Sequence, residues 1–140
     1  KPIINAPQLL RIRFAEKSKG RLSPIRGRER LTMLILNPKM EMSHAVNVTC
    51  EVTHAPDLKT ARAVSRSVVC SNLFKAAVFG RDANWGRILC AIGYTPGDFS
   101  IDKVCVWLSS AAGEVYVCEN AAYHPYSEDE AAKVLAGLNY

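Results

Sequence analysis

The sequence predicts a fold of the α+β class, and three observations support this prediction. Apolar and polar residues alternate with a two-residue period over residues 46–53, which is typical of a half-buried strand. Apolar residues recur at helical spacing in later segments. Two short apolar runs joined by a turn indicate a β-hairpin. The expected order of strand, helices, hairpin and helix favours an α+β domain.

The strand at residues 46–53 is followed by a turn and two helices. Asp57 belongs to a residue type favoured at the N-cap of a helix. A second helix is expected over about residues 85–92, between a polar turn and Gly93. The apolar residues of the first helix recur at intervals that place them on one face: Ala61, Val64, Val68 and Val69.

The last expected elements are a hairpin and a helix. The hairpin strands are residues 104–108 and 115–118, and both runs are apolar on both faces. We therefore expect the hairpin to be covered on each side. Ser127 and Glu130 have the spacing of a capping box, which indicates the start of a helix. The apolar residues of that helix lie on one side: Ala131, Val134, Leu135 and Leu138.

Length and composition exclude several classes of protein. The chain has 140 residues, of which 49% are hydrophobic and 22% charged. This length accommodates one domain, and this composition argues against a wholly disordered chain. No apolar run approaches the roughly 18–20 residues of a membrane span, and no secretory signal is visible. We expect no membrane contact and a reducing intracellular compartment.

The charge is distributed unevenly along the chain. Residues 1–40 contain ten basic and two acidic residues, a net charge of +8, whereas residues 41–140 contain eight basic and eleven acidic residues, a net charge of −3. We interpret residues 1–44 as a basic leader, rich in Pro and Gly, that is poorly ordered unless a partner holds it. A solvated tail and an arm that binds nucleic acid or an acidic partner both fit this pattern. Phe14 is its only aromatic residue, which weakens the case for nucleic acid.

Cysteine and histidine spacing predicts no metal site. The five cysteines are widely separated and lie among apolar neighbours, so buried free thiols are expected. His44, His54 and His124 share no ligand-like spacing, and we interpret them as loop residues.

One polar stretch between two apolar runs carries the most information. Asp82 and Asn84 can close an Asx turn and cap the helix that starts near Trp85. Gly86 and Gly93 allow another group to approach the backbone closely.

The two arginines of this stretch leave two interpretations open. Arg81 and Arg87 can form ion pairs with Asp82, which would make the stretch a structural junction between a loop and a helix. They can also bind a substrate carboxylate in a bidentate manner.

Residues 75–94 read Lys-Ala-Ala-Val-Phe-Gly-Arg-Asp-Ala-Asn-Trp-Gly-Arg-Ile-Leu-Cys-Ala-Ile-Gly-Tyr. This stretch resembles the hallmark of the glutamate N-acetyltransferases of arginine biosynthesis, also called ornithine acetyltransferases. Ala83 is a departure, because the family usually has Pro there. The resemblance extends over roughly residues 46–136.

The resemblance implies an N-terminal-nucleophile-hydrolase-like fold and an acetyl transfer from N-acetylornithine to glutamate. In such enzymes a precursor cleaves itself before a Thr, whose hydroxyl becomes the nucleophile. The family needs no metal, and some members use acetyl-CoA as acetyl donor. We assign Arg81, Asn84 and Arg87 as candidate substrate-binding residues. The resemblance also implies an oligomer in the cytoplasm, or in the mitochondrial matrix for a fungal-type source.

Thr32 is a candidate nucleophile, because Thr32-Met33-Leu34 resembles the Thr-Met-Leu of the family's cleavage point. Leu31 stands where the family has Ala, and the alternative interpretation is a Thr in an apolar strand. The family's substrate-binding Glu has no counterpart in residues 41–46. We therefore expect residues 45–140 to be part of the C-terminal β-chain domain, inactive without the α-chain and the remainder of the β-chain.

Overall fold

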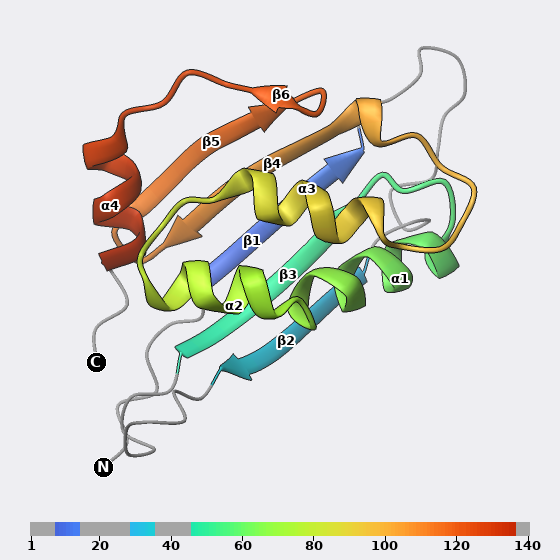
Figure 1. Ribbon diagram of the computed structural model, residues 1–140, viewed down its shortest axis with the longest axis horizontal. Helices are drawn as coiled ribbons and strands as arrows, with labels where there is room; N and C mark the ends of the chain where they lie inside the picture. Colours follow the sequence, from blue (N-terminus) through green and yellow to red (C-terminus); the bar gives the residue numbers. More distant parts are fainter. Residues whose placement is uncertain (1–7, 15–28, 36–45, 137–140) are drawn as a thin grey trace.

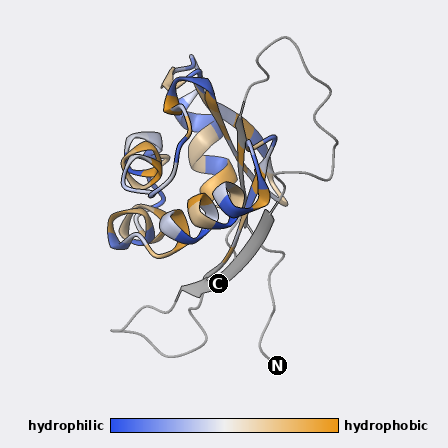
Figure 2. Cartoon of the chain, turned by 90° about the vertical axis from the view of Figure 1, so that its right-hand side faces the viewer, coloured by the Kyte–Doolittle hydropathy of each residue, from blue (hydrophilic) through white to orange (hydrophobic). Residues whose placement is uncertain are grey.

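The computed structural model describes residues 8–14, 29–35 and 46–136. It contains a sheet with helices packed on one face (Figures 1 and 2), which confirms the α+β class. The strands are β1 (Gln8–Phe14), β2 (Glu29–Ile35), β3 (Val46–Thr53), β4 (Val104–Ser110), β5 (Gly113–Glu119) and β6 (Ala122–Tyr123). The helices are α1 (Leu58–Val69), α2 (Asn72–Phe79), α3 (Trp85–Gly93), the short 3-10 helix η2 (Ile101–Lys103) and α4 (Glu128–Ala136). None of the helices in this described part is long and apolar enough to cross a membrane.

The six strands lie in the order β2-β3-β1-β4-β5-β6. Strand β1 pairs in parallel with β3 and antiparallel with β4, so it joins the N-terminal strands to the hairpin. The β2–β3, β4–β5 and β5–β6 pairs are antiparallel. The sheet is therefore mixed, and its centre depends on a strand from the first fourteen residues.

The hydrophobic core lies between the helices and one face of the sheet. Alternate residues of β3, β4 and β5 point toward this layer, as the two-residue period of a strand requires. Ile12 of β1 is completely buried there. Helix α1 packs on β2 and β3, and α4 packs on β4 and β5. The other described core residues of the sheet are Val48, Cys50, Val52, Val104, Val106, Leu108, Val115, Val117 and Cys118.

The helix starts that capping residues predict are present. The Asp57 carboxylate accepts a hydrogen bond of 2.7 Å from the backbone N–H of Thr60 and caps α1. The Ser127 hydroxyl accepts a bond of 3.3 Å from the N–H of Glu130 at the start of α4. Both predictions are confirmed, because each side chain satisfies a backbone donor that the first helical turn leaves unpaired.

Helix α2 is an addition to the expected order of elements. The apolar run after residue 72 is a separate helix, whose N-cap is Ser71. The Ser71 hydroxyl accepts a bond of 3.2 Å from the N–H of Phe74. The chain leaves α1 at Cys70 and starts α2 almost at once, so the two helices form a bent pair.

Two parts of the segment 1–44 correct our expectation of poor order. Residues 8–14 and 29–35 are strands of the sheet. The physical reason is non-local, because β1 provides ladder partners for both β3 and β4, and Ile12 adds to the core. The charge and the Pro and Gly content of the segment gave no sign of this pairing.

The hairpin β4–β5 is covered by helices on one face within the described residues. The described helices lie on one face only (Figure 2). On the opposite face the half-buried rings of Trp107 and Tyr116 stack, with centroids 4.4 Å apart and planes 6° from parallel. This aromatic pair gives apolar character to the face that no described helix covers.

Candidate functional site

The candidate site is the junction between α2 and α3, which contains the hallmark residues. Helix α2 ends at Gly80, and Arg81 then adopts a left-handed backbone conformation with φ of 53°. The N–H of Arg81 bonds to the carbonyl of Val78 at 3.1 Å, and the N–H of Asp82 bonds to that of Ala77 at 2.9 Å. This pair of bonds is a Schellman motif, which usually has Gly at the left-handed position.

Gly80 has a different role from the one its position suggests. Its own φ is −75°, which any residue can adopt. A Cβ atom at Gly80 would lie 3.3 Å from the carbonyl oxygen of Ala76, which is a tight contact. The glycine therefore provides space for the end of the helix, while Arg81 takes the left-handed conformation.

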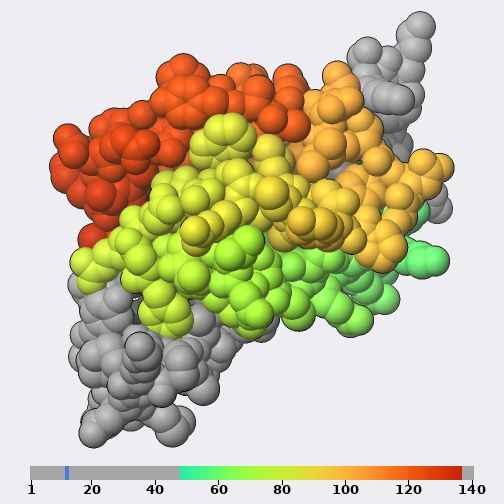
Figure 3. Space-filling view, viewed as in Figure 1, coloured from blue at the N-terminus to red at the C-terminus, as the bar shows by residue number. Residues whose placement is uncertain are grey.

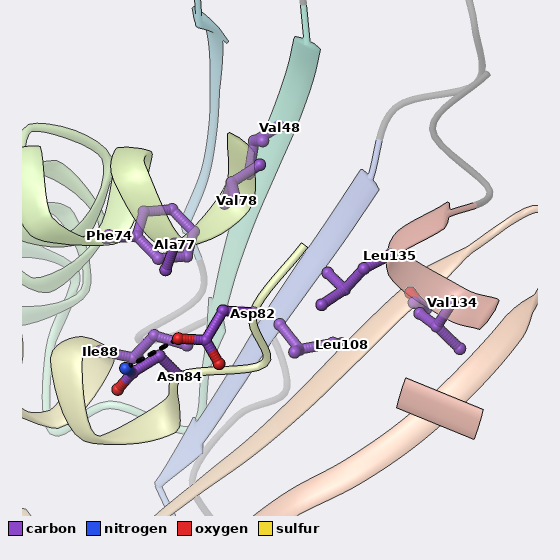
Figure 4. Close-up of a pocket in the computed structure, with 11 residues that line it drawn as sticks. Val48, Phe74, Ala77, Val78, Asp82, Asn84, Ile88, Leu108, Val134 and Leu135 are labelled. Atoms are coloured by element: carbon purple, nitrogen blue, oxygen red, sulfur yellow. Dashed lines mark hydrogen bonds between the residues drawn. The ribbon is translucent and has the colours of Figure 1, made fainter. Parts of the chain in front are cut away.

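Asn84 connects the loop to α3. Its Oδ1 accepts a bond of 3.1 Å from the N–H of Arg87 and so caps the helix. Its Nδ2 donates to Oδ2 of Asp82 at 3.1 Å (Figure 4). The carboxylate thus orients the amide that caps the helix, which confirms the prediction of a capped junction.

Arg87 ties α3 to α2. Its Nη1 donates to the backbone carbonyl of Leu73, in the first turn of α2, at 2.9 Å. This guanidinium therefore braces the two helices whose ends the loop connects. The donor of this hydrogen bond is charged, so the bond is stronger than one between two neutral groups.

The three candidate substrate-binding residues do not converge on one cavity. Asn84 lines a pocket between α2, α3, α4 and the sheet, together with Asp82 and apolar side chains (Figure 4). Its free volume is only about 10 Å³, room for one water molecule and not for an amino acid. Arg87 instead lines a groove of about 210 Å³ on the outside of the helix layer, and Arg81 lines neither. Their role in substrate binding stays a prediction.

Gly86 and Gly93 do not contact another part of the described chain closely. A Cβ atom at Gly93 would have nothing within 4 Å of it. A Cβ atom at Gly86 would lie 3.4 Å from Oδ1 of Asn84, an ordinary van der Waals contact. The expected close approach to the backbone is therefore not made by the residues that the structure describes.

Thr32 lies within β2, and its backbone is paired in register with Thr49 of β3. This placement agrees with the alternative interpretation, in which Thr32 is a residue of an apolar strand. Its role as a nucleophile stays a prediction.

The cysteines correct one expectation. Cys50, Cys105 and Cys118 are buried, but Cys70 and Cys90 are exposed. Burial raises the pKa of the Cys50 thiol, and burial together with Cys105 raises the pKa of Cys118 to about 11. The exposed pair and Arg87 line the same outer groove, a grouping that we did not predict from the sequence. The three-residue interval between Arg87 and Cys90 was the available signal, because it places both on one helix face.

The histidines show no metal-binding arrangement. His124 donates through Nδ1 to the carbonyl oxygen of Tyr116 at 3.0 Å, and its ring packs against the Tyr116 ring with the planes tilted by 33°. Nδ1 of His54 is buried without a hydrogen-bond partner in a residue with φ of 60°. No group of three potential ligands gathers in the described ranges, and His44 lies outside them.

These features define an α+β domain whose loop–helix junction is fixed by an Asn cap, a carboxylate and a bracing arginine. The chain belongs to the ArgJ family, whose model matches residues 42–139. That range includes every element from β3 to α4, the junction among them, and excludes β1 and β2.

Three curated relatives illustrate the similarity. The arginine biosynthesis bifunctional protein ArgJ of Caldanaerobacter subterraneus is 48% identical over 88 residues, which cover 63% of this chain and 22% of the relative. The protein of the same name from Thermotoga neapolitana is 43% identical over 89 residues, 64% of this chain and 22% of the relative. The mitochondrial ArgJ protein of Cryptococcus neoformans is 61% identical over 49 residues, 35% of this chain and 10% of the relative. No solved structure matches the chain.

Proposed function

We propose that this chain is part of a glutamate N-acetyltransferase/ornithine acetyltransferase, which moves an acetyl group from N-acetylornithine to glutamate. The family match over residues 42–139 carries this proposal, and the names of the relatives support a role in arginine biosynthesis. The chain spans about 22% of the length of these relatives, so the complete activity requires residues beyond those matched here.

The chemistry of acetyl transfer indicates which parts the matched segment supplies. A hydroxyl nucleophile needs an adjacent base, and the transition state needs donors for its oxyanion. In the junction, the Asn84 amide and one N–H donor of Arg87 form hydrogen bonds to other groups of this chain. We infer that it positions α2 and α3 against the sheet, while Thr32 remains a weaker candidate for the nucleophile. No metal is required by this chemistry, and acetyl-CoA is a possible second acetyl donor.

We propose that the rest of the enzyme packs on the face of the sheet opposite the helices, as a second layer in an N-terminal-nucleophile-hydrolase-like fold. The aromatic pair Trp107 and Tyr116 on that face supports this arrangement. The partners would be the α-chain and the remainder of the β-chain, in an oligomer. The family domain would be residues 45–140, and residues 1–44, apart from strands β1 and β2 of the shared sheet, would lie outside it.

Substrate contact by the junction would be made through Arg87 rather than Asn84. Arg87 uses one N–H for Leu73, and a guanidinium has five N–H donors. Arg81 and Asn84 are weaker candidates, because Asn84 is already committed to Asp82 and to the helix cap. The compartment would be the cytoplasm, or the mitochondrial matrix as the names of the fungal relatives suggest.

Complementation in solution tests this proposal. The chain is mixed with a fragment of the Caldanaerobacter protein that lacks the matched 88 residues, and acetyl transfer from N-acetylornithine to glutamate is measured. Activity of the mixture, with neither component active alone, supports the proposal. Inactivity of a mixture that nevertheless forms a stable complex contradicts it.

The charge of the N-terminal residues favours one alternative, a noncatalytic module that binds nucleic acid or an acidic partner. The net charge of +8 over residues 1–40 supports it. Binding of the chain to labelled RNA and DNA should then weaken steeply as salt concentration rises. Absence of binding at low salt removes this alternative for nucleic acid.

A further inference from the structure

The groove on the outer surface of the helix layer contains both exposed thiols of the chain. Cys70 follows the last residue of α1, and Cys90 lies in the second turn of α3. Both line an open space of about 210 Å³ together with Arg87, Ser71, Leu73 and Tyr94. We call this space the thiol groove, and Figure 3 shows the surface on which it lies, with α1 in green and α2 and α3 in yellow-green to yellow.

The two thiols of the groove differ from the other three in access. Cys50, Cys105 and Cys118 are buried in or beside the core, at 0%, 6% and 0% exposure. Cys70 and Cys90 are exposed and are contributed by two different helices. A reagent in solution can therefore reach this pair in the folded chain, whereas the other three thiols require unfolding.

A fixed positive charge lies beside the thiols. Arg87 and Cys90 are three residues apart in α3, so their side chains lie on the same helix face. The bond from Nη1 of Arg87 to the carbonyl of Leu73 holds the guanidinium at the groove. The N-terminal end of α2, with Ser71 as its cap, lies at the same place and adds the partial positive charge of a helix terminus.

We propose that the thiol groove is a site of thiol–disulfide exchange for small disulfides that carry carboxylates, such as oxidised glutathione. The carboxylate pairs with Arg87, which brings the disulfide to Cys90. The deprotonated Sγ of Cys90 attacks one sulfur of the disulfide. A new S–S bond forms to Cys90, the original S–S bond breaks, and the second half leaves as a thiolate that takes up the proton that Cys90 lost. The step is a disulfide exchange without a further oxidant, and it is independent of the proposed acetyl transfer.

The test compares an anionic with a neutral disulfide. The folded chain is treated with oxidised glutathione or with bis(2-hydroxyethyl) disulfide at low ionic strength, and modification is followed by intact mass and peptide mapping. We expect modification at Cys90 first, with Cys50, Cys105 and Cys118 unmodified. Cys90→Ser should abolish this early product, and Cys70→Ser should retain it.

The charge of Arg87 is tested through a ratio of rates. The rate with oxidised glutathione divided by the rate with the neutral disulfide should fall about fivefold in Arg87→Gln and should fall with added salt in the wild type. Lys133→Gln, an equal loss of charge on the exposed side of α4, should leave the ratio unchanged. Arg87→Lys retains the charge and should retain most of the ratio, which separates the charge from the bracing bond.

Two results would overturn the proposal. One is an unchanged ratio in Arg87→Gln, with circular dichroism matching the wild type. The other is modification of the buried cysteines as fast as Cys90, which would assign the reaction to unfolded chain.

Discussion

The guanidinium of Arg87, in the first turn of α3, donates at 2.9 Å to the backbone carbonyl of Leu73, in the first turn of α2. The two residues are fourteen positions apart in the sequence, and the hallmark loop lies between them. The bond therefore ties the start of α3 to the start of α2, while the Asn84 cap fixes α3 to the loop. This helix–loop–helix unit presents a filled pocket toward the sheet and an open groove toward solvent.

Loss of the Arg87–Leu73 bond should destabilise the chain. We expect Arg87→Met to lower the free energy of unfolding by about 1 kcal/mol, because a charge-assisted bond is lost at a partly exposed site. Urea denaturation followed by tryptophan fluorescence measures it. Lys75→Met on α2 is the control for general loss of charge, and an equal effect of the two variants would contradict the bracing role.

Removal of the Asn84 cap should have a similar cost. Asn84→Ala removes the side-chain acceptor of the Arg87 N–H, which keeps only its bond to the backbone carbonyl of residue 84, and it also removes the donor to Asp82. We therefore expect a loss of about 1 kcal/mol. Asn84→Ser should restore part of this stability, since Ser also caps helices. The stabilities are compared by their urea midpoints. An Ala variant as stable as the Ser variant would contradict a stabilising role of the Asn84 cap.

The turn between β5 and β6 contains a residue with an unfavourable backbone conformation. Asn120 and Ala121 have φ of 49° and 60°, so both central residues of this two-residue turn are left-handed. Glycine is the favoured second residue of such a turn. We expect Ala121→Gly to raise the free energy of unfolding by about 1 kcal/mol. Ala122→Gly, in the neighbouring strand, should lower it, and thermal denaturation that finds the same sign for both would contradict this explanation.

His54 offers a second position at which glycine should stabilise the fold. It combines φ of 60° with a buried Nδ1 that has no hydrogen-bond partner. His54→Gly relieves both features, and we expect a higher unfolding temperature than in the wild type. His54→Ala removes the imidazole but retains the backbone strain, so it should recover only part of the increase. A His54→Gly variant less stable than His54→Ala would show that the strain is not the dominant effect.

The cap of α1 predicts a pH dependence. The N–H of Thr60 donates to Asp57 and holds the pKa of this carboxyl below its ordinary value. Because the folded pKa lies below the unfolded pKa, this contribution to stability is complete above the unfolded pKa and is lost as the pH falls through the folded pKa. Free energies of unfolding measured from neutral to acid pH should fall less in Asp57→Asn than in the wild type. Parallel curves would contradict the prediction.

The face of the sheet opposite the helices should cause association. Trp107 and Tyr116 form an aromatic surface there, and such surfaces favour contact with another chain. We expect sedimentation velocity to show species larger than a monomer as concentration rises. Trp107→Thr should reduce association, whereas Tyr94→Ser, which removes an 85% exposed ring on the helix side, should not. A monomer at every concentration would contradict this prediction.

Local signals in the sequence predicted the helix caps correctly, because each cap depends on residues within one turn. Asp57, Asn84 and Ser127 all accept the backbone bond expected of them. Ser71 was an equally good signal for α2, but the apolar run after it masked the helix start.

Features that depend on distant parts of the chain were not predictable in this way. The place of β1 in the sheet requires both β3 and β4 as partners, and no local pattern reports them. Arg81, and not Gly80, adopts the left-handed conformation at the end of α2, and Gly80 is needed for the space beside the carbonyl of Ala76. The grouping of Cys70 with Cys90 depends on how α1 and α3 pack, so their apolar neighbours in the sequence suggested burial.

The most direct measurement is acetyl transfer by a chimera, in which this chain's matching residues replace the matched 88 residues of the Caldanaerobacter protein. We expect the folded chimera to transfer acetyl from N-acetylornithine to glutamate with kcat/KM within about tenfold of the parent. Asn84→Ala in the chimera should reduce its stability more than Asn84→Ser does. A chimera that folds with the parent's circular dichroism and unfolding temperature, yet transfers no acetyl group, would contradict the proposed function.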